Sequence, residues 1–458
     1  MSTDNLRVLI VAEHASLKLG GEASLPMHYF RILRQRGIEA WLIVHERTRD
    51  ELTAYFTEEL DRIYFIQDSF WHRLCWQLGK PLPHRAALFT TGFALRLLTQ
   101  FMQLRLAQKL VRKHGVTIVH QPIPVSPKEP SMLRKIGVPV VIGPMNGGMN
   151  YPPAFQHLEK SWVQLTVGIG RMMSNLFNRL IPGKLEASVL LVANARTRQA
   201  LPQGIKGKVI EIPENGVDLT LWQPVVKQPQ TPPVQQPTTG SETPVRFVYI
   251  GRLIDWKAID LLLFAFRRVA ETHPAILEII GDGPERENLQ AQAEELRLTQ
   301  TAAAACRLQG FVQFSGWLPQ TECAQRLETA DVLVMPSLME CGGAAALEAM
   351  AMGLPVIATN WGGFTDYLNA SCGILVEPSS PVDFIEGLAA AMIRLASNPE
   401  LRQLMGQAGR QRVLDHFNWD RKIDHILEIY QEAIDQGFKP VGSQPIATDL
   451  PLGKAATF

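Results

Sequence analysis

The sequence has 458 residues, 46% of them hydrophobic, and a formal net charge of +1, values typical of a soluble protein with two or three domains. Five scattered cysteines without Cys-x-x-Cys spacing argue against a disulfide framework or a zinc site and favour reduced thiols in the cytoplasm. Because residues 1–5 lead directly into a predicted strand and no apolar run reaches about 18–20 residues, we expect neither a signal peptide nor a membrane span. We also expect no nucleic-acid partner.

The first predicted unit is a strand, a glycine loop, a helix and a second strand. Leu6–Ala12 is a compact apolar run predicted as a strand, and Ala40–Val44 is the next one. Gly20 and Gly21 precede a helix predicted over Glu22–Arg36. This order indicates a βαβ unit and a parallel sheet. A glycine loop before a helix favours phosphate contact, but without a complete Gly-x-Gly-x-x-Gly it is not diagnostic by itself.

Positive charge is concentrated in one part of the chain. Residues 69–185 contain fifteen lysines and arginines but only two acids, Glu129 and Glu159. The long helix predicted over Ala86–Lys113 lies in this part and has basic residues beside apolar ones. Such a region suits an anionic membrane surface or an anionic acceptor. A solvated basic surface, with the apolar side of the helix in the core, is the open alternative.

Two later strands of the first half lead into polar residues. A strand predicted over Val116–His120 ends in His120, and a strand over Val138–Gly143 leads into a polar loop. Ligands bind at the carboxyl ends of parallel strands, so His120 is a candidate to hydrogen-bond sugar hydroxyls. A histidine satisfied by the backbone is the alternative. The loop is a candidate for the acceptor side through Asn146, Gly147 and Gly148.

The second folded half begins after a stretch rich in Pro, Gln and Thr at 223–244, which predicts a linker or a surface insertion. A strand is predicted over Val245–Gly251 and a helix over Ala258–Glu271. Arg252 and Lys257 lie between them, where an Arg and a Lys five positions apart can clamp a diphosphate beside the helix N-terminus. Structural salt bridges are their alternative role.

The most specific pattern lies between residues 331 and 359. A strand predicted over Asp331–Met335 leads into a glycine loop, a small-residue helix over Ala344–Met352 and a second strand over Leu354–Thr359. This is another βαβ crossover, with its loop where parallel sheets bind ligands. Glu340 lies in that loop. Glu348 is the only charged residue of an otherwise apolar helix, so its ionised form needs a partner.

The spacing of Glu340 and Glu348 resembles the Glu-x7-Glu motif of the retaining glycosyltransferases of family 4, in which the first glutamate contacts the donor sugar and the second the nucleotide ribose. Arg252 and Lys257 match that family's Gly-Arg-Leu…Lys-Gly element, which neutralises the leaving diphosphate. The resemblance implies the catalytic residues His120, Arg252, Lys257 and Glu340. It implies donor contacts from Gly20, Gly21, Gly251, Arg252, Lys257, Gly281, Glu340, Cys341, Gly342, Gly343, Ala344 and Glu348.

Two departures from that family's pattern are visible. Cys341-Gly342-Gly343 stands where many members have Pro-Phe-Gly, and should still expose backbone amides. Ala258 follows Lys257 where glycine is usual.

The resemblance also implies the fold, which is α/β and of the GT-B type: two Rossmann-like, doubly wound domains facing a cleft. We expect an N-terminal acceptor-side domain over residues 1–215 and a C-terminal donor domain over 245–415, on either side of the linker at 223–244. A helix over 416–436 should cross back onto the N-terminal domain. Residues 437–458 lack periodicity and are predicted to be a disordered tail.

The function implied by the resemblance is transfer of a sugar from a nucleotide-sugar donor to an acceptor hydroxyl with retained anomeric configuration, in polysaccharide or glycolipid synthesis. The chain contains no Asp-x-Asp motif, so we predict no metal, and we expect no other cofactor. The acceptor is a glycan, a lipid-linked sugar or a soluble sugar, and the expected location is the cytoplasm or the cytoplasmic face of an anionic membrane. Two alternatives stay open: a nucleotide-sugar 2-epimerase and a non-catalytic nucleotide-sugar-binding subunit of the same fold.

Overall fold

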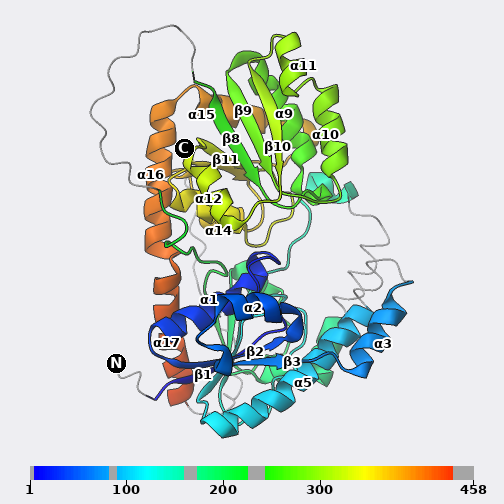
Figure 1. Cartoon of the computed structure of the whole chain (residues 1–458), viewed down its shortest axis with the longest axis vertical. Helices are drawn as coiled ribbons and strands as arrows, with labels where there is room; N and C mark the ends of the chain where they lie inside the picture. The colour runs from blue at the N-terminus through cyan, green and yellow to red at the C-terminus, as the bar shows by residue number, and fades with distance from the viewer. Residues whose placement is uncertain (1–4, 82–89, 159–172, 225–242, 437–458) are drawn as a thin grey trace.

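Two α/β domains are stacked in the computed structural model, which describes residues 5–81, 90–158, 173–224 and 243–436 (Figure 1). The predicted tail at 437–458, and residues 225–242 of the predicted linker, lie outside the described residues. The strands of the first sheet fall between residues 7 and 211, and those of the second between 245 and 376. The chain therefore completes one sheet before it begins the other.

The first sheet is parallel, and within the described residues its strand order is β3-β2-β1-β4-β5-β6-β7. The strands are β1 (Arg7–Val11), β2 (Glu39–His45), β3 (Ile63–Ile66), β4 (Ile118–Gln121), β5 (Val140–Met145), β6 (Val189–Val192) and β7 (Lys208–Glu211). The helices are α1 (Gly21–Gln35), α2 (Arg49–Tyr55), α3 (Phe70–Gly79), α5 (Thr91–His114), α7 (Gly183–Glu186) and α8 (Ala195–Gln199), with short 3₁₀ helices η1 (Glu46–Thr48), η2 (Leu60–Arg62) and η3 (Pro153–Leu158). The order reverses between β1 and β4, as in a doubly wound sheet.

The central strand β1 shows why helices cover both faces of this sheet. Successive side chains of a strand point to opposite faces. Val8 and Ile10 join a core cluster that also contains residues of α1, whereas Leu9 and Val11 join a second cluster with residues of α5. The four apolar residues after Arg7 are therefore buried from both sides of the sheet, the usual state of a parallel strand.

The second sheet is also parallel, and its described strands run β10-β9-β8-β11-β12-β13. The strands are β8 (Val245–Ile250), β9 (Ala275–Ile280), β10 (Gly310–Gly316), β11 (Val332–Met335), β12 (Val356–Thr359) and β13 (Gly373–Val376). The helices are η4 (Asp255–Lys257), α9 (Ile259–Thr272), α10 (Arg286–Glu295), α11 (Gln300–Ala305), α12 (Gln320–Glu328), α13 (Ala344–Ala351), α14 (Phe364–Tyr367), α15 (Pro381–Ala396), α16 (Pro399–His416) and α17 (Trp419–Asp435). The predicted crossover at 331–359 is confirmed as β11, α13 and β12.

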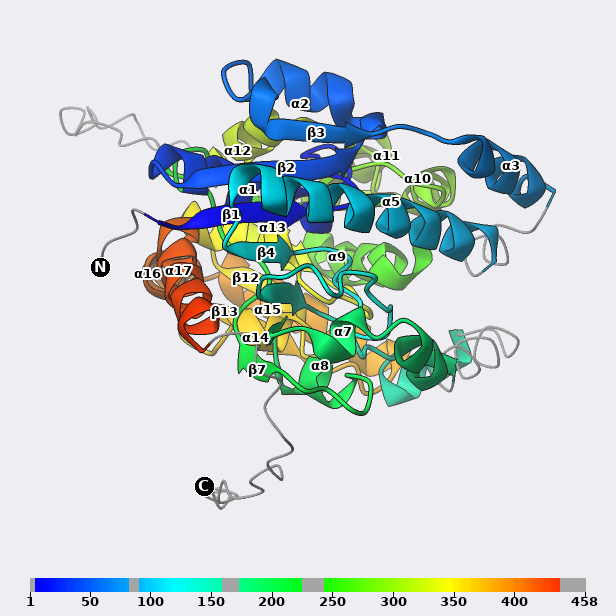
Figure 2. The same cartoon turned by 90° about the horizontal axis from the view of Figure 1, so that it is seen from below.

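The last two helices connect the domains. Helix α16 packs beside α13 and α15 of the second domain, while α17 lies against the first (Figures 1 and 2). Ile423, Ile426 and Tyr430 of α17 are buried in the same core cluster as Val8 of β1. Arg36, directly after α1, also forms ion pairs with acids of α17. The predicted crossing helix is therefore present.

The region between residues 45 and 115 contains more structure than its pattern indicated. Strand β3, helix α2 and helix α3 were not predicted, and the helix expected from Ala86 is described only from Thr91, because 82–89 lies outside the described residues. These elements are short, and α2 and α3 carry exposed apolar residues such as Tyr55 and Phe70, so their periodicity is weak. No helix of the described ranges is long and apolar enough to cross a bilayer.

Candidate active site between the two domains

Lys257 and Glu340 meet at the point where the strand order of the second sheet reverses. Lys257 ends η4 after β8, Glu340 follows β11, and these two strands are neighbours. The Lys257 ammonium pairs with the Glu340 carboxylate, and their side chains are only 13% and 16% exposed. The Leu338 N–H also donates to the Trp256 carbonyl at 2.9 Å, which holds the two loops together. Ligands of doubly wound sheets bind at this switch point.

The glycine loop before α13 is shaped for close approach. Gly343 has φ +61°, and a Cβ there would lie 2.8 Å from the Phe364 ring. Across the domain boundary, a Cβ at Gly21 would lie 3.6 Å from the Cβ of Ala344. Gly21 begins α1 and Ala344 begins α13, so two helix N-termini approach each other from opposite domains. Their unpaired N–H groups and dipoles favour an anion such as a phosphate.

Arg252 lies at the edge of this site, in the loop after β8. Its backbone carbonyl accepts a 3.0 Å hydrogen bond from the Tyr249 hydroxyl, and its side chain is exposed. Among the described residues, no acid forms an ion pair with the Arg252 guanidinium. A Cβ at Gly281 would lie 1.8 Å from the Gly251 carbonyl oxygen, so these two loops touch only because residue 281 is glycine. Arg252 is thus held by its backbone and keeps its donors available.

Glu348 lies on α13, and no hydrogen bond or ion pair joins its carboxyl group to any described residue. Burial raises the pKa of Glu348 to about 7. Burial likewise raises the pKa of the Cys341 thiol to about 12, so this thiol stays protonated at neutral pH. The Glu348 side chain is still partly exposed, so a ligand hydroxyl could reach its carboxyl group and supply the hydrogen bond that the described residues do not.

His120 has a different place from the one predicted. It is fully buried in β4, where Nε2 donates to the Gly143 carbonyl at 2.6 Å and Nδ1 accepts from the Tyr430 hydroxyl at 2.6 Å. Burial lowers the pKa of His120 to about 4, so the imidazole is neutral. Because both ring nitrogens have protein partners, the expected contact with the donor sugar is corrected: His120 connects β4 to the crossing helix α17.

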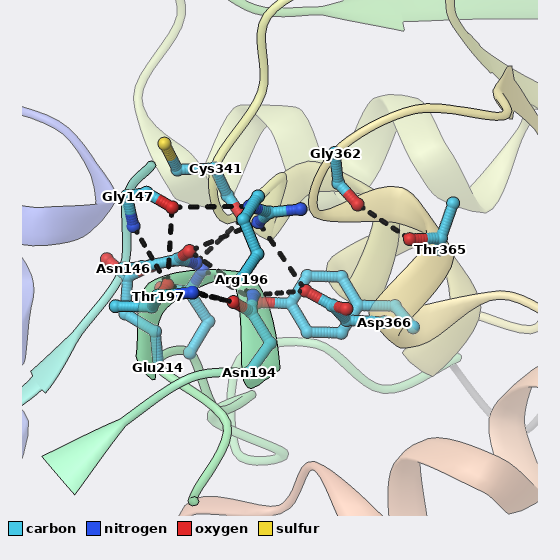
Figure 3. Close-up of polar contacts among 12 residues, drawn as sticks. Asn146, Gly147, Asn194, Arg196, Thr197, Glu214, Cys341, Gly362, Thr365 and Asp366 are labelled. Carbon is cyan, nitrogen blue, oxygen red and sulfur yellow. Dashed lines mark hydrogen bonds and ion pairs between the residues drawn. The ribbon is translucent and has the colours of Figure 1, made fainter. Parts of the chain in front are cut away.

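The predicted acceptor loop contacts the donor loop directly through Asn146 (Figure 3). The Asn146 amide nitrogen donates to the Cys341 carbonyl and to the Glu214 carboxylate, both at 2.7 Å. The neighbouring Gly147 N–H donates to the Thr197 hydroxyl at 3.1 Å. In Gly148, φ is +74° and a Cβ would lie 3.1 Å from the Ala200 Cβ, so glycine suits this bend. The loop is therefore a link between the domains.

Asn194 and Asp366 form a second link between the domains that sequence reasoning missed. The Asn194 amide donates to the Asp366 carboxylate at 2.7 Å, and the Arg196 guanidinium lies 3.9 Å from the same carboxylate (Figure 3). Burial raises the pKa of Asp366, partly offset by the Asn194 hydrogen bond and by Arg196. The position of Asn194 at the carboxyl end of β6 was the available signal.

Glu214 is the buried acid of the junction, and its role was also missed. Burial raises its pKa to about 7, and the Asn146 hydrogen bond works against that shift. The Lys422 ammonium of α17 donates to the Glu214 backbone carbonyl and lies 4.5 Å from the Trp419 ring. A Cβ at Gly342 would lie 3.1 Å from a Glu214 carboxylate oxygen. The Glu214 side chain therefore packs against the donor loop at Gly342.

Comparison with known proteins agrees with this geometry. The family model for glycosyl transferases group 1 matches residues 233–412, which contain the Lys257–Glu340 pair and Glu348. Over 226 residues the chain is 30% identical to a glycogen synthase of Mycobacterium tuberculosis, covering 49% of each chain. Over 199 residues it is 33% identical to a D-inositol 3-phosphate glycosyltransferase of Thermomonospora curvata, covering 41% of this chain and 43% of that one. The chain thus spans about half the length of the curated relatives it matches.

Solved structures are similar over nearly the whole chain. A sucrose-phosphate synthase from Thermosynechococcus elongatus superposes with a TM-score of 0.61 at 19% identity, covering 94% of this chain and all of that one. Anabaena HepE, solved in complex with UDP and glucose, gives 0.56 at 17% identity, covering 93% and 100%. The fold is therefore GT-B, and the second half of the chain is similar in sequence to the glycosyl transferases of group 1.

Proposed function

We propose that this protein transfers a sugar from a nucleotide-diphosphate sugar to an acceptor hydroxyl with retained anomeric configuration. The observation that carries the proposal is the Lys257–Glu340 pair at the switch point of the second sheet, beside the approaching N-termini of α1 and α13. The names of the relatives, and the UDP bound to HepE, support a nucleotide-sugar as donor.

In the proposed reaction the donor diphosphate binds between Arg252, Lys257 and the helix N-termini. Its negative charge competes with Glu340 for the Lys257 ammonium. Glu340 is thereby released to accept hydrogen bonds from hydroxyls of the donor sugar, while Glu348 accepts them from the ribose. As the bond between the sugar and the diphosphate breaks, negative charge grows on the leaving oxygen. The two cations stabilise that charge, the kind of effect that usually contributes most to catalysis.

Retention follows from attack on the same face of the sugar as the leaving group. The acceptor oxygen forms the new bond to the anomeric carbon, and the acceptor proton passes to the departing diphosphate. We assign no side chain as a covalent nucleophile, because the Cys341 thiol is kept protonated by burial. Arg252 and Lys257 supply the positive charge, so we propose a reaction without a metal or another cofactor.

For the acceptor we propose a growing polysaccharide or a glycolipid at the cytoplasmic face of a membrane. The support is the unequal charge distribution, since residues 69–185 carry fifteen cations against two acids. A basic surface raises the local concentration of anionic lipids and of acceptors attached to them.

The test is a panel of UDP-, GDP- and ADP-linked sugars incubated with the full chain, first without acceptor and then with short glycans and lipid-linked sugars. Released diphosphate and new products are measured by mass spectrometry. Glu348→Ala runs beside the wild type, with Glu295→Ala as a control because Glu295 is exposed on α10.

Release of nucleoside diphosphate from one donor, reduced in Glu348→Ala but not in Glu295→Ala, would support the proposal. Donor that is isomerised without an acceptor would instead show a nucleotide-sugar 2-epimerase. Donor binding with no turnover under any acceptor condition would show a non-catalytic binding subunit, and the proposal would be abandoned.

A further inference from the structure

Helix α3 occupies an unusual position in the first domain. It follows β3, the edge strand of the sheet, and projects from the domain on the side away from α16 and α17 (Figures 1 and 2). Among the described elements its main packing partner is α5. A short helix that projects from an edge strand leaves one side that no other described element covers.

The inner side of α3 is fixed by polar contacts. The Ser69 hydroxyl accepts the His72 N–H, and the His72 ring accepts the Ser69 N–H, which together form a reciprocal N-cap. The other His72 ring nitrogen lies 3.1 Å from the Thr99 hydroxyl of α5. Asp68, just before the helix, lies 3.2 Å from the buried His45 ring at the end of β2. Because these contacts set the rotation of α3, its opposite side must face outward.

That outer side is apolar and aromatic. Phe70 is 64% exposed, Trp71 60% and Leu78 58%. At about 100° per residue these three, with Leu74 between them, fall within an arc of roughly 100° on one face of the helix. Trp76 is 63% exposed as well. Ordinary protein surfaces carry single, scattered apolar residues. Several large apolar side chains on one short helix instead indicate an interaction surface.

The charges that follow this face along the chain, as far as Glu129, are all positive. The sequence contains no acid between Asp68 and Glu129. Arg73 and Lys80 lie on and directly after α3, and within the described ranges neither forms an ion pair. One exposed face of α5 carries four residues at spacings of three or four: Phe101, Arg105, Lys109 and Arg112. The apolar face of α3 is therefore accompanied by cations on α3 and α5, while the acid at its N-terminal end, Asp68, is paired with Arg47.

We propose that the outer face of α3 docks on an anionic lipid bilayer. Aromatic rings that enter the headgroup layer, with lysines and arginines beside them, are the chemistry that such a surface recognises. A second copy of this chain would carry the same positive charge at the same face, so the charge disfavours self-association there. The proposal deepens the proposed function, because it identifies a surface that would bring the active site to a lipid-linked acceptor, but its test needs no sugar transfer.

The experiment is flotation of the full chain with vesicles of phosphatidylcholine alone or of phosphatidylcholine with 30–50% phosphatidylglycerol, roughly the charge range over which basic surfaces bind lipid. Low and physiological salt are compared. The test variant is Phe70→Ser with Trp71→Ser, which removes exposed rings only. The matched control is Trp317→Ser, because Trp317 is 59% exposed on the second domain. Circular dichroism verifies that each variant is folded.

We expect binding to the anionic vesicles but not to the neutral ones, weakened at least tenfold by the double substitution and unchanged by Trp317→Ser. Salt should weaken it because part of the attraction is electrostatic. Failure of the wild type to bind at low salt, or equal binding by the double variant, would overturn the proposal. Self-association in solution that the double variant abolishes would also overturn it, in favour of a second copy as the partner. Donor turnover in solution is read separately, so a failure here leaves the proposed function standing.

Discussion

At the scale of single residues, the site holds the charges of Lys257, Glu340 and Glu348 in a neutralised form, while Arg252 is exposed to solvent. Lys257 is paired with Glu340, and burial favours the neutral form of Glu348. Both arrangements avoid an isolated charge inside the protein, which would be expensive. A nucleotide-sugar offers a better partner to each group, because its diphosphate attracts the lysine and its ribose hydroxyls can donate to the glutamate. Ligand binding and the ionisation of these residues should therefore be coupled.

Substitution of Lys257 tests whether its ammonium group binds the donor diphosphate. Lys257→Ala should lower turnover at least about a hundredfold, because one of the two cations that stabilise the leaving diphosphate is lost. Lys208→Ala is the matched control, since it also breaks a Lys–Glu pair, with Glu432, but on the exposed surface. Steady-state rates of diphosphate release measure both. Near-normal rates for Lys257→Ala would remove Lys257 from the proposed diphosphate clamp.

The pH dependence of stability tests whether Glu348 is neutral in the folded protein. Because burial raises the Glu348 pKa from 4.5 to about 7, the folded protein holds a proton there that the unfolded chain releases in this pH range. This difference in bound protons makes the folded protein less stable relative to the unfolded chain as pH rises from 4.5 to 7. Glu348→Gln removes it and should be more stable than the wild type at pH 8, by on the order of 2 kcal/mol.

At pH 4.5 the two proteins should be nearly equal. Urea unfolding of ligand-free protein at both pH values measures the difference, with Glu295→Gln as the exposed control. A difference that does not change with pH would contradict the raised pKa of Glu348.

At the scale of the elements, the site depends on close contact between loops that follow neighbouring strands. Gly281 after β9 touches the backbone of Gly251 after β8, and Gly343 opens the turn into α13 beside Phe364. Such approaches leave no room for a side chain, so glycine is needed for space as well as for conformation. The loops are therefore fixed by the sheet, and this places Arg252 and Lys257.

Two glycines with positive φ allow the cost of a steric clash to be distinguished from the cost of the backbone conformation. Gly281 has φ +145° and Gly353 has φ +82°, but a Cβ at Gly281 would lie 1.8 Å from the Gly251 oxygen, whereas at Gly353 nothing lies within 4 Å. Gly353→Ala should cost only the free energy of holding an alanine at positive φ, about 1–2 kcal/mol. Gly281→Ala should cost several kcal/mol more, since backbone must move. Thermal unfolding of both variants measures this, and equal losses would contradict the close approach of the two loops.

At the scale of the whole molecule, two kinds of contact join the domains. The crossing helix α17 is buried against the first domain, and the loops around Asn146 and Asn194 bond to the second (Figure 3). The apolar contacts of α17 are extensive, whereas the loop contacts are a few hydrogen bonds. We therefore expect the helix to keep the domains together while the loop contacts break and re-form during substrate exchange.

Tyr430→Phe tests the link between α17 and β4. It leaves the His120 Nδ1 buried without its hydrogen-bond donor and should cost about 1–2 kcal/mol of stability. Because His120 lies outside the donor site, sugar transfer should change less than twofold. Unfolding and activity measurements are compared with Tyr55→Phe, since Tyr55 is 46% exposed. A large loss of activity with unchanged stability would return His120 to the catalytic machinery.

Features that depend on neighbours along the chain could be predicted before the fold was known. The apolar run of β1, the crossover around α13 and the glutamate pair eight residues apart are local patterns, because each element must satisfy its own backbone and bury its own apolar side. The position of Arg252 and Lys257 between a strand and a helix was predictable for the same reason. The local pattern placed Arg252, Lys257 and Glu340 in the segments that follow strands, and Glu348 on a helix, as the structure has them.

Which of these residues contact each other, and which are buried, depends on how distant segments pack in the fold. His120 was expected beside the donor sugar, but packing against Tyr430, 310 residues away, buries it. Asn194 pairs with Asp366 over 172 residues. The exposure of Phe70 and Trp71 likewise follows from how α3 lies on α5. Burial and pairing of this kind are properties of distant segments brought together, so no local pattern in the chain contains them.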